Sequence, residues 1–150
     1  MAKEIERKFL VASDAWRAAA TGSKRIVQGY LSDGHGVTVR IRIFDDARAV
    51  LTIKAGGTVL SRDEYEYDVP LADGRELVAH AEGRVIEKRR HAVPYAGRDW
   101  EVDVFEGRHA GLVLAEIEME SEDAEVELPD WVGEDVTGDP RYYNSALAGG

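Results

Sequence analysis

The feature that most constrains the fold is a two-residue alternation of apolar and charged side chains along nearly the whole chain. In one segment, for example, Val39 and Ile41 alternate with Arg40 and Arg42. Because successive side chains of a β-strand point to opposite faces, this period predicts strands with one apolar and one charged face. The predicted strands are Glu4–Val11, Arg25–Ser32, Gly36–Phe44, Ala49–Lys54, Leu60–Val69, Arg84–Ala92, Asp99–Phe105 and Leu112–Glu120.

Short glycine-containing turns separate several of these strands, as at residues 32–36 and 55–57. Turns of this kind join antiparallel neighbours, so the sheet is predicted to be largely antiparallel. Three short helices are also predicted. One follows Ser13, whose side chain suits a helix N-cap, a second spans residues 72–83, and a third lies near Tyr142.

The charges on the polar faces are sorted by sign. Arg40 and Arg42 make one strand basic, whereas Glu64 and Glu66 make another acidic. Like charges at neighbouring positions on one face repel each other, although a one-sided sheet with its charged face in water remains an alternative for any single strand. A closed antiparallel barrel explains the sorting better, because acids and bases from different strands then meet in a solvent-filled interior and the apolar faces point outward.

The composition limits what this interior can bind. The chain has 150 residues, no cysteine and a net charge of −10, which predicts one domain over residues 1–150 and disfavours binding to nucleic acid or an anionic membrane. Without cysteine, a metal site must use oxygen or histidine ligands, which favours Mg²⁺ or Mn²⁺. No apolar run is long enough to span a bilayer and no signal peptide is evident, so a cytoplasmic location is predicted.

Acids and bases that converge on one cavity suit a ligand of dense negative charge that travels with a divalent cation. Basic side chains hold the oxygens of such a ligand, and carboxylates hold the cation. Polyphosphate fits this description. An organic carboxylate would not require so many acidic residues.

Several motifs resemble those of the CYTH family, the triphosphate tunnel metalloenzymes. The first is the N-terminal Glu-x-Glu-x-Lys signature, which is similar to Glu4-Ile-Glu-Arg-Lys8. The others, in chain order, are QGYL at 28–31, VRIR at 39–42, TIK at 52–54, RDEYEYDV at 62–69, EKRR at 87–90, WEVDVFEG at 100–107 and AEIEME at 115–120. A single alternating motif would be weak evidence, but this ordered series covers almost the whole chain.

The resemblance implies an α+β fold that is mainly β: an eight-stranded antiparallel barrel around a triphosphate tunnel, with a few short helices packed outside. The residues that it implies for substrate binding are Lys8, Arg40, Arg42, Lys54, Lys88, Arg90 and Tyr30. The residues that it implies for metal binding are Glu4, Glu6, Glu116, Glu118 and Asp103. The catalytic set that it implies is Glu64, Glu66, Lys88 and Glu116. The helix near Tyr142 is expected to cap one mouth of the tunnel and to bring Arg141 or Tyr142 to the lumen.

Inorganic tripolyphosphate is the expected substrate, because the short chain shows no inserted segment for a base or a thiazole ring. Four alternatives remain open from the sequence: a thiamine triphosphatase, a nucleoside triphosphatase, a class IV adenylyl cyclase and a noncatalytic polyphosphate-binding module. A homodimer is also expected if three short helices leave part of the outer apolar face uncovered.

Overall fold

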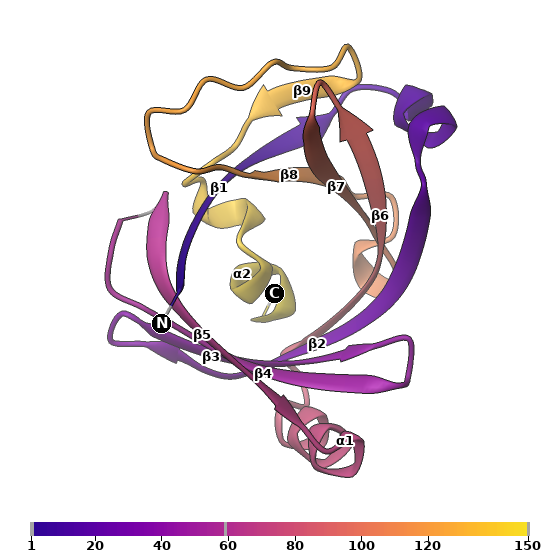
Figure 1. Ribbon diagram of the computed structural model, residues 1–150. Helices are drawn as coiled ribbons and strands as arrows, with labels where there is room; N and C mark the ends of the chain where they lie inside the picture. The colour runs from indigo at the N-terminus through magenta and orange to yellow at the C-terminus, as the bar shows by residue number, and fades with distance from the viewer. Residues whose placement is uncertain (1, 59, 150) are drawn as a thin grey trace.

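A computed structural model describes residues 2–58 and 60–149 as a closed antiparallel β-barrel (Figure 1). Neighbouring strands follow the order β5-β4-β3-β2-β6-β7-β8-β1, and pairing between β1 and β5 closes the ring. The eight strands of the ring are β1 (Ala2–Val11), β2 (Gly22–Gly34), β3 (Val37–Phe44), β4 (Arg48–Ala55), β5 (Ser61–Val69), β6 (Val85–Tyr95), β7 (Arg98–Phe105) and β8 (Val113–Glu118). The predicted barrel is confirmed, with several strands longer than predicted.

A ninth strand, β9 (Val132–Asp135), was not predicted. Strand β1 pairs with β5 only through its first residues, up to Ile5, and β9 pairs with β1 at Phe9 and Val11. The other edge of β1 pairs with β8. Four residues are too few for a periodic pattern to show in the sequence. The position of β9 is set instead by the edge of β1 beyond Ile5, which β5 leaves unpaired.

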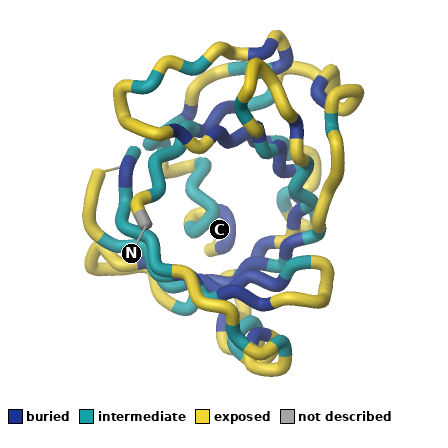
Figure 2. The backbone as a smooth tube through the Cα atoms, viewed as in Figure 1, coloured by how far each residue is buried: buried dark blue, intermediate teal, exposed yellow. Residues whose placement is uncertain are grey.

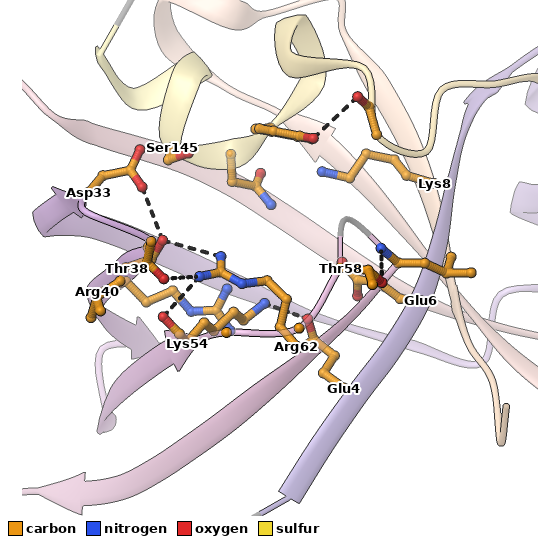
Figure 3. A pocket seen from close by; sticks show the side chains of 18 of the residues that line it. Glu4, Glu6, Lys8, Asp33, Thr38, Arg40, Lys54, Thr58, Arg62 and Ser145 are labelled. Atoms are coloured by element: carbon orange, nitrogen blue, oxygen red, sulfur yellow. Dashed lines mark hydrogen bonds and ion pairs between the residues drawn. The ribbon is translucent and has the colours of Figure 1, made fainter. Parts of the chain in front are cut away.

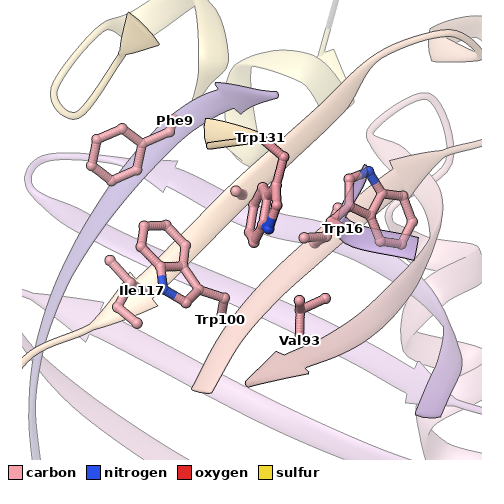
Figure 4. Close-up of a cluster of buried hydrophobic side chains, with 8 residues drawn as sticks. Phe9, Trp16, Val93, Trp100, Ile117 and Trp131 are labelled. Atoms are coloured by element: carbon pink, nitrogen blue, oxygen red, sulfur yellow. The ribbon is translucent and has the colours of Figure 1, made fainter. Parts of the chain in front are cut away.

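The outward face of the barrel carries the main apolar core. Phe9, Trp100 and Trp131 pack together, with ring centroids 5.5 Å apart for Phe9 and Trp100 and 5.6 Å for the two tryptophans (Figure 4). Trp16 joins this cluster from η1 (Asp14–Ala19), a 3-10 helix that begins after the N-cap Ser13. The outer face of this wall is therefore covered by η1 and by the segment that leads into β9.

The second predicted helix, α1 (Leu71–His80), packs on the outside of the barrel below β3 and β4 (Figure 1). Gly74 permits this contact, because a Cβ atom at that position would lie 2.4 Å from the Cβ of Ala49. Exposed positions concentrate in loops, hairpin tips and α1, whereas the ring of strands is mostly buried or half-buried (Figure 2). No helix within the described ranges has the length and apolar character needed to cross a membrane.

The last helix, α2 (Asn144–Gly149), lies across the interior rather than outside the barrel (Figure 1). It follows the short 3-10 helix η3 (Pro140–Tyr142), and its Leu147 and Ala148 pack against inward-facing Ile86, Phe105 and Leu114. At this end of the barrel the inward side chains are apolar, so they give the helix an apolar surface to cover. The expectation that a C-terminal helix caps the tunnel thus agrees with the structure.

Candidate active site

Two adjoining cavities occupy the interior of the barrel, with volumes of about 940 Å³ and about 250 Å³. The larger is bordered by the β2–β3 and β4–β5 hairpins and by residues 136–138 and 143–145 (Figure 3). The smaller extends toward the other end of the barrel, where Glu66 and Glu118 lie. The residues that line both cavities are Glu4, Glu6, Arg40, Lys54 and Asn144.

The basic residues predicted to bind phosphate all face this interior. They come from four strands, β1, β3, β4 and β6, and share the inward parity of those strands. Arg40 and Lys54 line both cavities, Lys8 lines the larger one, and Arg42, Lys88 and Arg90 line the smaller one. Tyr30, the remaining predicted substrate-binding residue, lines the larger cavity.

The predicted acidic residues also converge here, with one exception. Those that line the smaller cavity are Glu4, Glu6, Glu64, Glu66, Glu116 and Glu118. Asp103 lines neither cavity. It lies behind two cations: its carboxylate oxygens are 2.8 Å from Lys88 Nζ and 2.8 and 2.9 Å from Nε and Nη2 of Arg90. Asp103 is thus placed to orient Lys88 and Arg90, and its expected role as a metal ligand stays a prediction.

Basic and acidic strands form ion pairs along the inner wall of the barrel. Arg42 Nη2 lies 3.1 Å from Glu66 Oε2, and Arg40 Nη2 lies 3.9 Å from Glu64 Oε2. These residues belong to β3 and β5, which are separated by β4, where Thr52 lies opposite both Arg40 and Glu66 and Lys54 lies opposite Glu64. The basic strand β3 thus has an acidic partner in β5, which offsets the repulsion within each of these two strands.

Arg40 has the fewest close polar partners of these cations in the described residues. It is 7% exposed, its only ion pair within the described ranges is the 3.9 Å contact with Glu64, and its Nε has no hydrogen-bond partner there. Lys54 is held more firmly, with its Nζ 2.6 Å from Glu4 Oε1 (Figure 3). A buried guanidinium with so few partners is suited to receive an anion.

The carboxyl groups of the lumen that hold their protons unusually tightly include Glu6 and Glu64. Burial, together with the nearby charges of Glu116 and Glu4, raises the pKa of Glu6 from 4.5 to about 8. Burial and a hydrogen bond with Glu4 raise the pKa of Glu64 to about 7. Burial opposes ionisation of Glu116 as well, but Lys8 and Arg90 outweigh it and hold the pKa of that carboxyl well below its usual range. The cations of the lumen therefore balance the negative charge of an ionised Glu116, but they do not balance that of an ionised Glu6.

The carboxylates offer the hard oxygen ligands that Mg²⁺ and Mn²⁺ prefer. Glu6 is the one that fits best, because it lines both cavities and has no ion pair in the described part of the chain. A divalent cation next to Glu6 would offset the repulsion that the negative charges of Glu116 and Glu4 exert on the ionised Glu6 carboxylate. In the described residues no three acidic or histidine side chains already form a metal-binding cluster, so Glu4 and Glu116 would turn from their lysine partners to complete one.

The raised pKa values predict how the stability of the metal-free protein depends on pH. The folded protein retains protons on Glu6 up to a pKa of about 8 and on Glu64 up to about 7, whereas the unfolded chain releases them near 4.5. The folded state then binds more protons than the unfolded state, so its free energy of unfolding falls as the pH rises from about 4.5 to 8. Urea unfolding of metal-free protein across this range measures the slope.

Glu6→Gln serves as the control for this prediction, since the amide cannot ionise and the variant should show a flatter pH dependence. Addition of Mg²⁺ or Mn²⁺ should restore stability at the upper end of the range, because a cation binds the ionised carboxylate. Stability that rises with pH over this window in both proteins would contradict the prediction.

The residues of the lumen that the sequence did not predict include Lys24, Arg62 and Asn144. Lys24 and Arg62 share the inward parity of β2 and β5, so the alternation carried a signal for both. Asn144 comes from a short helix and has no such signal. Contrary to expectation, Arg141 does not reach the lumen. Its side chain is exposed and forms an ion pair with Asp139 at 2.7 Å. Tyr142 contributes its backbone carbonyl, which accepts a hydrogen bond from Lys8 Nζ at 2.9 Å.

Two curated relatives resemble the chain over nearly its full length. An inorganic triphosphatase of Acetivibrio thermocellus is 46% identical over 148 residues, which cover 98% of this chain and 94% of the relative. An inorganic triphosphatase of Nitrosomonas europaea is 39% identical over 149 residues, which cover 97% of this chain and 96% of the relative.

Solved structures show the same fold. The inorganic triphosphatase NE1496 aligns with a TM-score of 0.70 and 36% identity over 100% of this chain and 97% of its own. The PH1012 protein of Pyrococcus horikoshii aligns with a TM-score of 0.63 and 19% identity, over 80% of both chains, which shows a shared fold alone. The CYTH domain pattern matches residues 2–143. The ordered motifs, the barrel and these relatives together establish that the chain belongs to the CYTH family.

Proposed function

We propose that the protein is a metal-dependent hydrolase that cleaves inorganic tripolyphosphate to pyrophosphate and phosphate. The observation that carries the proposal is the convergence of Lys8, Arg40, Lys54, Lys88 and Arg90 on one lumen that also contains ionisable carboxylates. The two relatives at 46% and 39% identity, both named inorganic triphosphatases, support it.

The arrangement suggests how the phosphate chain is held. Arg40 and Lys54, which line both cavities, would bind its middle part, and Lys8 would bind the part that extends into the larger cavity. Lys88 and Arg90, which Asp103 holds in place, would neutralise the charge that develops on the terminal phosphoryl group in the smaller cavity. A bound Mg²⁺ or Mn²⁺, held by Glu6 with Glu4 and Glu116, would polarise the phosphoryl oxygens.

In this proposal, residues of the acidic strand β5 position the attacking water. Glu64 has a pKa raised to about 7 by burial and by Glu4, which suits a group that accepts a proton near neutral pH. In this hypothesis Glu64, with Glu66 beside it, orients the water and takes its proton. The water oxygen forms a bond to the terminal phosphorus, the bridging P–O bond breaks, and pyrophosphate leaves.

A substrate panel tests the proposal. Tripolyphosphate, ATP and thiamine triphosphate are each incubated with Mg²⁺, with Mn²⁺ or with EDTA, and phosphate, pyrophosphate and cyclic AMP are measured. We expect phosphate release from tripolyphosphate with kcat/KM about tenfold or more above the other substrates, and none in EDTA.

Other outcomes of the panel would contradict the proposal in distinct ways. Binding of tripolyphosphate without release would indicate a noncatalytic module, and cyclic AMP with pyrophosphate from ATP would indicate a cyclase. Preference for ATP or thiamine triphosphate would change the substrate but retain the hydrolysis.

Four points stay predictions from the sequence. They are the choice between Mg²⁺ and Mn²⁺, the cytoplasmic location, the absence of nucleic acid or membrane partners, and the homodimer. The net charge of −10 continues to disfavour binding to nucleic acid or to an anionic membrane surface. Gel filtration with light scattering tests the dimer directly.

A further inference from the structure

Asn144 is the one residue from outside the strands that lines both cavities among the described residues. The other four that do so are charged residues of β1, β3 and β4, namely Glu4, Glu6, Arg40 and Lys54. The CYTH domain match ends at residue 143, so Asn144 lies beyond the matched segment. Asn144 thus places a neutral side chain at a junction that is otherwise lined by charged residues.

The contact with Lys88 determines which way the amide of Asn144 points. Lys88 Nζ donates a hydrogen bond to Asn144 Oδ1 at 3.5 Å, in addition to its bond with Asp103 at 2.8 Å. An ammonium group can only donate, so the amide oxygen must face Lys88 and the Nδ2 group must face away from it. Nδ2 has no hydrogen-bond partner in the described part of the protein, and Asn144 is only half-buried. Two N–H donors are thus left beside the lumen.

The backbone on both sides of Asn144 is anchored. Before it, the carbonyl of Tyr142 accepts a hydrogen bond from Lys8 Nζ at 2.9 Å. After it, the carbonyl of Leu147 accepts one from His109 Nε2 at 2.7 Å and another from Arg108. The side chain of Asn144 is therefore presented from a fixed position, which lowers the entropy that ligand binding must overcome.

We propose that Asn144 binds the phosphate chain directly, donating from Nδ2 to a phosphate oxygen where the two cavities meet, while its Oδ1 keeps Lys88 Nζ directed into the smaller cavity. This inference rests on the proposed function. A neutral amide adds donors at this point without adding positive charge to a lumen whose cations already neutralise Glu116 and Asp103.

Asn144→Asp provides the sharpest test, because it keeps the size of the side chain and an oxygen toward Lys88 but replaces the two N–H donors with an anionic oxygen. We expect KM for tripolyphosphate to rise about tenfold or more, and Asn144→Ala to show a smaller rise. The control is Ala146→Asp, which adds the same charge at an exposed position of α2 and should leave KM within about twofold of the wild type. Melting temperatures of all variants are measured in parallel.

An unchanged KM in both Asn144 variants, or a loss confined to kcat together with a lowered melting temperature, would overturn the inference, because Asn144 would then only support α2. Failure of the proposed function looks different, since the wild type itself would not cleave tripolyphosphate. In that case calorimetric titration with tripolyphosphate still decides: weaker binding by Asn144→Asp than by wild type and Ala146→Asp supports the contact, and equal binding overturns it.

Discussion

Replacement of Arg40 with alanine is expected to lower kcat/KM for tripolyphosphate by about 10²–10³ while the fold stays intact. Arg40 is buried, lines both cavities and approaches its only carboxylate partner in the described chain no closer than 3.9 Å. Its charge is thus available to the phosphate chain. Because an under-paired buried cation destabilises the free protein, the melting temperature of Arg40→Ala should equal or exceed that of the wild type.

Arg48→Ala is the matched control for this variant. Arg48 lies on the adjacent strand β4, is exposed, and pairs with the exposed Asp68 at 3.0 Å. Loss of such a surface pair has little effect on stability, and we expect its kcat/KM to stay near that of the wild type. Full activity of Arg40→Ala, or an equal loss in both variants, would argue against the assignment of Arg40 to phosphate binding.

The double variant Glu4→Ala/Glu6→Ala is expected to lose activation by Mg²⁺ or Mn²⁺ and to retain at most about 10⁻² of the wild-type rate. Glu6 lines both cavities and has no ion pair in the described residues, and Glu4 neighbours it on the inward face of β1. Removal of both leaves Glu116, which Lys8 and Arg90 already neutralise, as the remaining member of the proposed metal-binding set. Calorimetric titration with Mn²⁺ should show weakened binding in parallel with the lost activity.

Glu125→Ala/Glu127→Ala removes the same amount of charge from the exposed segment before β9 and serves as the control. Its metal activation should match that of the wild type, since long-range effects of exposed charges are screened by salt. If the Glu4/Glu6 double variant kept full activity with Mg²⁺, the assignment of these residues to the metal would be wrong.

The barrel itself could be predicted from the sequence because the two-residue alternation is a local property. Val39 and Ile41 on one parity, and Arg40 and Arg42 on the other, show which side chains share a face before any partner strand is known. The sorting of charge by sign then indicated which of the two faces points inward. The same reasoning, applied to Lys24 and Arg62, would have added both to the lumen.

The positions of β9 and α2 could not be predicted in the same way. β9 is a four-residue strand that completes the edge of β1, and α2 is a six-residue helix that covers the apolar end of the lumen. Each is stabilised by contacts with distant segments rather than by its own pattern, as the bond between Lys8 Nζ and the carbonyl of Tyr142, 134 residues away, shows.

The sequence by itself thus determined the eight strands of the ring, their inward faces and most of the charged residues that line the barrel, because the direction of a side chain in a strand depends only on its parity. Only the tertiary structure decided how these charges are paired. Closure of the barrel brings Lys54 to within 2.6 Å of Glu4, places Asp103 behind Lys88 and Arg90, and brings Asn144 to Lys88. These pairings depend on how different segments meet when the barrel closes: β4 with β1, β7 with β6, and α2 with β6. The same arrangement leaves Glu6 and Arg40 as the charges most open to a metal ion and a phosphate.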